Sequence, residues 1–275
     1  MDWDNHDQPT VVIDLTHYAS GREGKTVEAK EHSLNGKTAL VTGGSRGIGK
    51  AIVEALLSEG MSVWTTSRNW AAARGAEEAF RRAAAGAAGT YHPFRCDNAD
   101  PQAIRRLFSS MRRSCPALEL LVNNAGIGLF APALEVEVEQ WERVMDVNAR
   151  GTFLMSQAAF GWMKESGGGR IINIASAVGI KGYANQAVYT ASKHAVMGIT
   201  RALAREGQPW GIRVSAVCPG GVDTELISRA RPDLKPAELI QPADVARSVL
   251  YLAREPETCC TDLIQLRRAS STPFG

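Results

Sequence analysis

Short apolar runs alternate with longer amphipathic stretches from Lys37 onward, and this alternation constrains the fold more than any other feature of the sequence. Helix-length segments separate the apolar runs, as in a parallel sheet with helices on both faces. The runs that fit buried strands are 37–42, 61–67, 90–96, 118–124, 169–176, 211–219 and 262–266. We therefore predict an α/β fold with a single doubly wound, Rossmann-like parallel β-sheet of about seven strands.

The first 34 residues differ in composition from the rest: they are acidic and carry three of the five histidines. We predict a flexible N-terminal extension over residues 1–34 and one folded domain over residues 35–275. No apolar run reaches the roughly 20 residues of a membrane span, and the N-terminus lacks the basic and apolar regions of a secretion signal. We expect a cytoplasmic protein that does not bind membranes.

Charge and cysteine usage argue against two classes of site. The formal net charge of +2 is too small to indicate a nucleic-acid partner. The five cysteines have neither metal-ligand spacing nor the pattern of a disulfide framework. We predict reduced thiols, no metal site and no nucleic-acid partner.

The stretch TGGSRGIGKA at 42–51 has the glycines of a phosphate-binding turn between a predicted strand and a predicted helix. Glycine lets the backbone approach a phosphate closely, and a helix N-terminus supplies free N–H groups. Counted from Gly44, the stretch resembles the loop that binds nucleoside triphosphates, but Ala51 stands where that loop needs a hydroxyl for Mg²⁺. The spacing of Gly43, Gly47 and Gly49 suits the pyrophosphate of a dinucleotide, which we therefore favour.

Several motifs together resemble the short-chain dehydrogenase/reductase family, in its order and spacing. They are TGGSRGIG at 42–49, NNAG at 123–126, Ser176, YTASK at 189–193 and PGGVDT at 219–224. The resemblance runs from about Leu34 to about Leu266 and implies a dinucleotide-binding, catalytic domain that interconverts alcohols and ketones. The positions that it assigns to coenzyme binding are Gly43, Ser45, Arg46, Gly47, Ile48, Gly49, Arg68, Asp97, Asn98, Asn124, Ala125, Gly126, Tyr189, Lys193, Pro219, Gly220, Val222 and Thr224.

The residues after the second predicted strand bear on the choice of coenzyme. Folds of this kind that bind NAD have an acidic residue about 20 positions beyond the glycine loop, but 61–76 contains neither Asp nor Glu. Arg68 follows the strand and Arg46 lies in the loop, so two guanidinium groups are available for a 2′-phosphate. We predict NADP(H). Asp97 matches the family's adenine-contacting acid, and we interpret Asn98 more readily as a helix cap than as a second contact.

Tyr189 and Lys193 lie four residues apart on a predicted helix over 188–207, so their side chains share a face. Reduction of a carbonyl leaves negative charge on oxygen, which a nearby acid must protonate. We predict that Tyr189 is this acid, that Lys193 lowers its pKa, and that Ser176 donates a hydrogen bond to the substrate oxygen. The resemblance adds Asn148, on a predicted helix over 138–164, as a link from the lysine to a water chain; a buried asparagine satisfied by backbone is the alternative.

The predicted function is the NADPH-dependent reduction of a ketone to a secondary alcohol, or the reverse oxidation. The predicted substrate is a small carbonyl or alcohol of apolar or aromatic character, because most side chains expected around the pocket are apolar: Leu129, Phe130, Val178, Ile180, Tyr183 and Leu226. The resemblance implies a homotetramer or homodimer. The alternative function is a non-catalytic NADP(H)-binding sensor or interaction protein. The C-terminal TDLIQLRRASSTPFG departs from the family because it lacks the glycine-rich turn that often follows the last strand.

Overall fold

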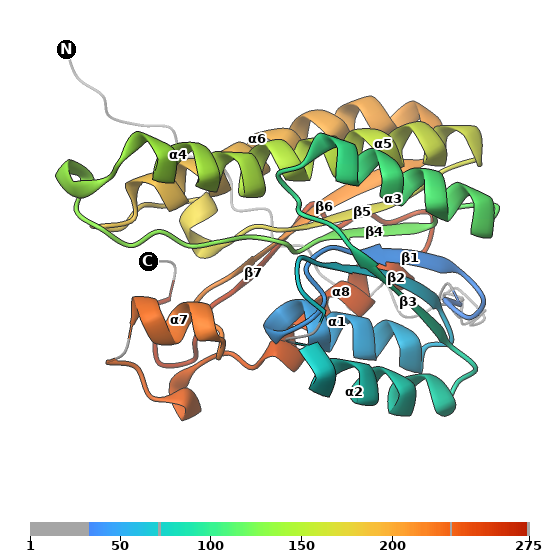
Figure 1. The fold of residues 1–275 in the computed structure, drawn as a ribbon, viewed down its shortest axis with the longest axis horizontal. Coiled ribbons are helices and arrows are strands. Elements are labelled where there is room, and N and C mark those ends of the chain that lie inside the picture. Colours follow the sequence, from blue (N-terminus) through green and yellow to red (C-terminus); the bar gives the residue numbers. More distant parts are fainter. Residues whose placement is uncertain (1–32, 71–72, 232, 274–275) are drawn as a thin grey trace, which may run out of the picture. The chain divides into compact units, whose positions relative to one another are not determined.

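The computed structural model describes residues 33–70, 73–231 and 233–273, and every structural statement below concerns these residues. They contain a seven-stranded parallel sheet in the order β3-β2-β1-β4-β5-β6-β7 (Figure 1). The strands are β1 (Thr38–Val41), β2 (Ser62–Ser67), β3 (Thr90–Arg95), β4 (Leu120–Asn123), β5 (Gly169–Ile174), β6 (Ile212–Pro219) and β7 (Leu263–Leu266). The predicted doubly wound α/β fold is confirmed, and each predicted strand ends within two residues of the observed one.

Helices cover both faces of the sheet, as Figure 1 shows for α3, α5 and α6 on one side and α1, α2 and α8 on the other. The helices are α1 (Gly47–Ser58), α2 (Arg74–Ala85), α3 (Pro101–Ser114), α4 (Val138–Met145), α5 (Gly151–Glu165), α6 (Ala187–Gly207), α7 (Glu225–Ala230) and α8 (Pro242–Arg254). The short α7 follows the carboxyl end of β6 and so lies at the edge of the sheet where ligands bind.

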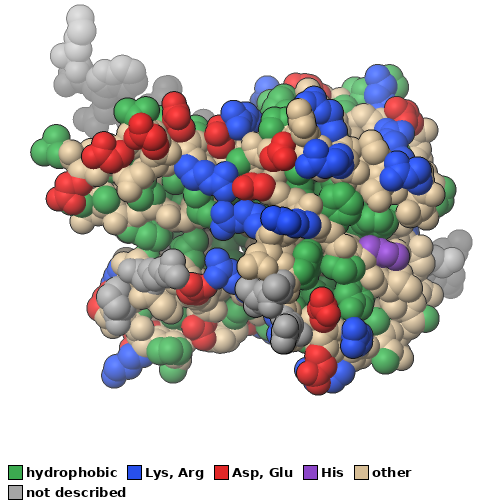
Figure 2. Space-filling view, viewed as in Figure 1, with side chains coloured by type: hydrophobic (Ala, Val, Ile, Leu, Met, Phe, Trp, Pro, Cys, Tyr) green, Lys and Arg blue, Asp and Glu red, His purple; other side chains and the backbone are tan. Residues whose placement is uncertain are grey.

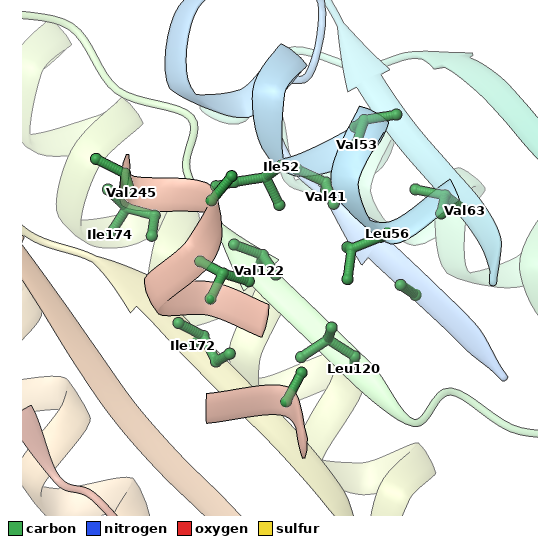
Figure 3. Close-up of a cluster of buried hydrophobic side chains, with 14 of the residues drawn as sticks. Val41, Ile52, Val53, Leu56, Val63, Leu120, Val122, Ile172, Ile174 and Val245 are labelled. Carbon is green, nitrogen blue, oxygen red and sulfur yellow. The ribbon is translucent and has the colours of Figure 1, made fainter. Parts of the chain in front are cut away.

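The central strands β1, β2, β4, β5 and β6 are buried on both faces, which explains their apolar residues, whereas the edge strands β3 and β7 are only partly buried. In β1, Ala39 and Val41 pack into the core beneath α1, α2 and α8, whereas Leu40 packs into the core beneath α3 and α5. Figure 3 shows the first core, in which Ile52 and Leu56 of α1 meet apolar side chains of the central strands. The two-residue repeat of a strand thus divides one run between two cores.

The predicted helix over 138–164 is one continuous helical segment, but it is not a regular α-helix. Between α4 and α5, residues Asp146–Arg150 form a π-helical turn. Such turns widen the helix by one residue per turn and occur frequently at functional sites. The sequence did not reveal this turn, which carries Asn148.

The predicted N-terminal extension, residues 1–34, lies almost wholly outside the described residues. Leu34, its last residue, is 5% exposed and belongs to the core beneath α1, α2 and α8. The folded region therefore begins no later than Leu34.

Candidate active site

A cavity of about 1480 Å³ lies at the carboxyl ends of the strands. Figure 2 shows a hollow in the surface between the regions of α4 and α7, with Lys and Arg side chains gathered about it. The lining of the cavity includes the glycine loop, the ends of β2, β5 and β6, and α7. Every predicted coenzyme-binding and catalytic residue lines this one cavity except Asn148, which is buried behind it.

The glycine loop is held by hydrogen bonds that leave its backbone facing the cavity. Asn124 Nδ2 donates to the carbonyl oxygens of Thr42 and Gly43 at 3.0 and 3.1 Å. Thr42 Oγ1 accepts from the backbone N–H groups of Asn124 and Ala125, both at 3.0 Å. The loop is thereby joined to the end of β4, and neither Thr42 nor this bonding role of Asn124 was foreseen from the sequence.

Two glycines of the loop are required by its geometry. Gly47 has φ of +54°, a left-handed conformation that side chains disfavour. At Gly49, a Cβ would lie less than 3.0 Å from both Gly43 O and Asn124 Nδ2. Because α1 begins at Gly47 and its first residues line the cavity, its free N–H groups are available to an anion there.

The residues predicted to select the coenzyme line the same cavity. Arg68 is exposed directly after β2, and Arg46 forms an ion pair with Glu225 of α7. Asp97 is hydrogen bonded to Arg143 at 2.8 Å. Partial burial acts to raise the pKa of Asp97, but the hydrogen bonds from Ala99 N–H and Arg143 outweigh it and lower that pKa. Asp97 is therefore a carboxylate at neutral pH.

The interpretation of Asn98 as a helix cap is wrong. Asp100 caps α3, since its side chain accepts a hydrogen bond from Gln102 N. Asn98 is 6% exposed and donates through Nδ2 to Val147 O at 3.0 Å, which ties the end of β3 to the π-helical turn. Its Oδ1 is buried without a hydrogen-bond partner among the described residues, although the residue lines the cavity.

Ser176, Tyr189 and Lys193 meet where β5 ends beneath α6. Ser176 Oγ accepts a hydrogen bond from Val178 N at 3.3 Å, which leaves its O–H proton available for another acceptor. Lys193 Nζ donates to Ile174 O at 2.9 Å and lies 5.9 Å from the centre of the Tyr189 ring. The three side chains therefore face the same end of the cavity.

The expectation that Lys193 lowers the pKa of Tyr189 is wrong, because the pKa of Tyr189 is raised in this structure. Burial raises the pKa of Tyr189 to about 12, although a hydrogen bond to Ser176 acts in the opposite direction. Burial also lowers the pKa of Lys193 to about 8, because desolvation disfavours its ammonium. At neutral pH the pair is therefore a neutral phenol beside a cation, and the phenol can act as a proton donor.

Asn148 is 1% exposed, and its side-chain amide is fully hydrogen bonded. Its Oδ1 accepts from Ile127 N and its Nδ2 donates to Ile127 O, each at 2.9 Å. Nδ2 also donates to Ser192 Oγ at 3.0 Å, and Ser192 in turn donates to Tyr189 O at 2.7 Å. The π-helical turn thus fixes both the loop after β4 and the first turn of α6, which corresponds to the buried, backbone-bonded alternative for this asparagine.

Comparison with known proteins agrees with this geometry. A family model described as short chain dehydrogenase matches residues 37–235. The chain belongs to the short-chain dehydrogenase/reductase family. It is therefore an oxidoreductase that acts on CH–OH or C=O groups with a nicotinamide coenzyme.

Individual relatives cover most of this short-chain dehydrogenase/reductase. A D-threitol dehydrogenase of Mycolicibacterium smegmatis is 34% identical over 81% of this chain and 87% of its own length. An acetoacetyl-CoA reductase of Rhizobium meliloti is 36% identical over 80% of this chain and 91% of its own. The crystal structure of a metagenomic short-chain oxidoreductase in complex with NADP superposes with a TM-score of 0.75 at 32% identity, covering 86% of this chain and all of that one.

The structure also adds residues to the cavity of this short-chain dehydrogenase/reductase that the sequence did not indicate. The residues at and after the end of β7 contribute Gln265, Leu266, Arg267, Arg268, Ser271 and Thr272. The rule that ligands bind at carboxyl ends of strands applies to β7 as well, so this signal was available. Leu129 and Ile180, expected in the substrate pocket, are not among the lining residues; Ile180 packs instead against buried residues of α6 and β6.

Within the described residues, no helix combines the length and apolarity needed to cross a bilayer. No cluster of three or more His, Cys, Asp or Glu side chains in these residues could hold a metal ion.

Proposed function

We propose that this protein is an NADPH-dependent ketone reductase in which Tyr189 is the general acid. The observation that carries the proposal is that Ser176, Tyr189 and Lys193 line the same cavity as the glycine loop. A protein that only bound the coenzyme would not need a neutral phenol, a hydroxyl and a cation at one end of it.

The cavity fits a phosphorylated dinucleotide. Gly49 lets the loop pass close to Asn124 without a Cβ, and the N–H groups at the start of α1 suit the pyrophosphate. Arg46 and Arg68, with no acidic residue between 61 and 76, suit a 2′-phosphate. The nicotinamide end of the coenzyme would be contacted by the segment after β6: Pro219, Gly220, Val222 and Thr224. The adenosine end would donate a hydrogen bond to the buried Asn98 Oδ1.

The bound reduced nicotinamide supplies the hydride that is transferred to the carbonyl carbon. Ser176 would donate a hydrogen bond from its hydroxyl to the carbonyl oxygen, which stabilises the negative charge that develops there. Tyr189 gives its phenolic proton to that oxygen, and Lys193 stabilises the phenolate that remains. Asn148 and Ser192 position Tyr189 through the backbone of α6, since Ser192 donates to Tyr189 O. In oxidation, the same groups act in reverse.

The side chains around Tyr189 favour a carbonyl compound with an apolar body. The ring of Phe130 lies 5.7 Å from that of Tyr189, and Val178, Tyr183 and Leu226 also line the cavity. One relative is named a reductase and another a dehydrogenase, which is consistent with either direction of reaction. We further propose that the protein acts as a homodimer or homotetramer in the cytoplasm.

The test is the oxidation of NADPH, followed by its absorbance, with a panel of aliphatic, cyclic and aromatic ketones. We expect turnover with the wild type, a loss of roughly 10²–10⁴-fold in Tyr189→Phe, and tighter binding of NADPH than of NADH. Tyr251→Phe, an exposed tyrosine of α8 outside the cavity lining, is the matched control. Binding of NADPH without turnover of any ketone or alcohol would instead favour the non-catalytic NADP(H)-binding sensor.

A further inference from the structure

The cavity carries more positive charge than a dinucleotide requires. Among the described residues, seven Lys and Arg side chains line it, against three carboxylates, those of Asp97, Asp223 and Glu225. The proposed coenzyme accounts for Arg46, Arg68 and Lys193. The remaining cations are Lys181, Arg231, Arg267 and Arg268.

Three of these remaining cations have neighbours in or beside the cavity: Lys181 with Tyr183, Arg231 with Asp233, and Arg268 with Gly221. Lys181 Nζ lies 5.3 Å from the centre of the Tyr183 ring. Asp233 forms a bidentate ion pair with Arg231, at 2.7 and 2.5 Å, and also interacts with the charge of Arg268. We call Lys181, Arg231 and Arg268 the cationic rim, in which the two guanidinium groups of Arg231 and Arg268 interact with one carboxylate, that of Asp233.

The turn after β7 brings Arg268 into this position. Arg267 Nη1 donates to the carbonyl oxygens of Arg268, Ala269 and Ser271, at 3.1, 3.2 and 2.8 Å. Arg267 therefore holds the turn together, in place of a glycine-rich turn. The stem of Arg268 passes over Gly221, with its Cδ 3.6 Å from the point where a Cβ of Gly221 would stand.

Apolar side chains lie beside Tyr189 in the same cavity as the cationic rim. Phe130 packs against the Tyr189 ring, and a Cβ at Gly128 would meet both Phe130 and Leu226. Tyr183, half exposed, lines the same cavity and lies beside Lys181 of the rim. A ligand whose carbonyl is at Tyr189 would thus have its apolar body against Phe130 and Leu226 and its far end at the rim.

From this arrangement we infer that the substrate is a ketone whose apolar body ends in an anionic group, a carboxylate or a phosphate, which the cationic rim binds. This inference rests on the proposed reductase function, which it narrows to a substrate class. Exposed charge pairs contribute modestly, so each rim cation should change the KM for such a substrate roughly two- to fivefold.

The experiment uses methyl ketones with methylene spacers of increasing length that end in a carboxylate or a phosphate, and the uncharged methyl esters of the carboxylates. With NADPH, kcat/KM should be higher for an anionic ketone than for its ester at one or more spacer lengths, and salt should reduce this ratio. The two terminal groups separate a carboxylate substrate from a phosphorylated one. Arg268→Gln should raise the KM of the anionic ketone, whereas Asp233→Asn, which removes the opposing charge, should lower it. Arg247 is an exposed arginine of α8 outside the cavity lining, so Arg247→Gln should leave the KM of the anionic ketone and that of its ester unchanged.

Two outcomes distinguish failure of the inference from failure of the proposed function. In the first, the ketone acids, phosphates and esters are reduced with equal kcat/KM, and Arg268→Gln and Asp233→Asn leave these values unchanged. That result would overturn the cationic rim as a substrate site but would support the proposed reductase function. If no ketone is reduced, calorimetric titration of the NADP⁺ complex with the corresponding alkyl carboxylates and phosphates still tests the rim. Binding weakened by Arg268→Gln and strengthened by Asp233→Asn would support it, and no binding would overturn it.

Discussion

Substituting Gly49 by Ala tests whether the glycine loop is packed as the structure has it. The new Cβ would lie less than 3.0 Å from Gly43 O and from Asn124 Nδ2, so one of them must move. Moving Asn124 breaks its hydrogen bonds to Thr42 O and Gly43 O, at 3.0 and 3.1 Å. Each broken bond costs about 1–3 kcal/mol where a partly buried group is left unpaired, while alanine returns about 1 kcal/mol of helix propensity.

We therefore expect Gly49→Ala to lower the free energy of unfolding by about 2–4 kcal/mol and to weaken NADPH binding by roughly tenfold or more. Urea denaturation and fluorescence titration with NADPH measure the two effects. Gly75→Ala is the control, because a Cβ at this position of α2 meets nothing within 4 Å and should leave stability unchanged or slightly higher. If Gly49→Ala matches the wild type in both assays, the loop does not approach Asn124 as described.

Two further predictions concern charge in the cavity. Because burial lowers the pKa of Lys193 to about 8 while that of Tyr189 is about 12, the lysine loses its proton first as the pH rises, and kcat/KM for ketone reduction should fall above about pH 8. A pH profile that stays level up to the ordinary lysine pKa of about 10.4 would contradict this. Glu225→Gln removes the carboxylate that pairs with Arg46, so it should strengthen NADPH binding roughly two- to fivefold without changing the affinity for NADH. Fluorescence titration with each coenzyme measures both affinities. An unchanged affinity for NADPH would mean that Arg46 does not reach the 2′-phosphate.

The central strands could be predicted because burial on both faces leaves a short run of apolar residues, whereas the partly buried edge strands β3 and β7 follow from the alternation of strand and helix. The run ALVT ends β1 with residues that pack into both cores, and no other element of this length needs apolar side chains on every side. The π-helical turn at Asp146–Arg150 has no such pattern, since its hydrogen bonds with Asn98 and Ile127 join it to residues distant in the sequence.

The candidate site divides in the same way. The positions of Gly43, Ser176, Tyr189 and Lys193 follow from local spacing, because a strand end and a helix face determine where each side chain starts. The pKa values do not follow, since the distance from Lys193 to Tyr189 and the burial of both side chains are tertiary properties. Spacing on a helix suggested a cation that lowers the pKa of the phenol; desolvation in the folded protein has the larger effect.

By itself, the sequence determined the doubly wound sheet, the glycine loop at its carboxyl edge and the trio of Ser176, Tyr189 and Lys193, because these depend on residue type and on separations along one element. Only the tertiary structure decided that Glu225 meets Arg46, that Asn148 supports Tyr189 through Ser192, and that Arg268 packs over Gly221 in the lining of the cavity. These contacts join residues far apart in the chain. Their geometry depends on how layers pack against each other, which local periodicity does not encode.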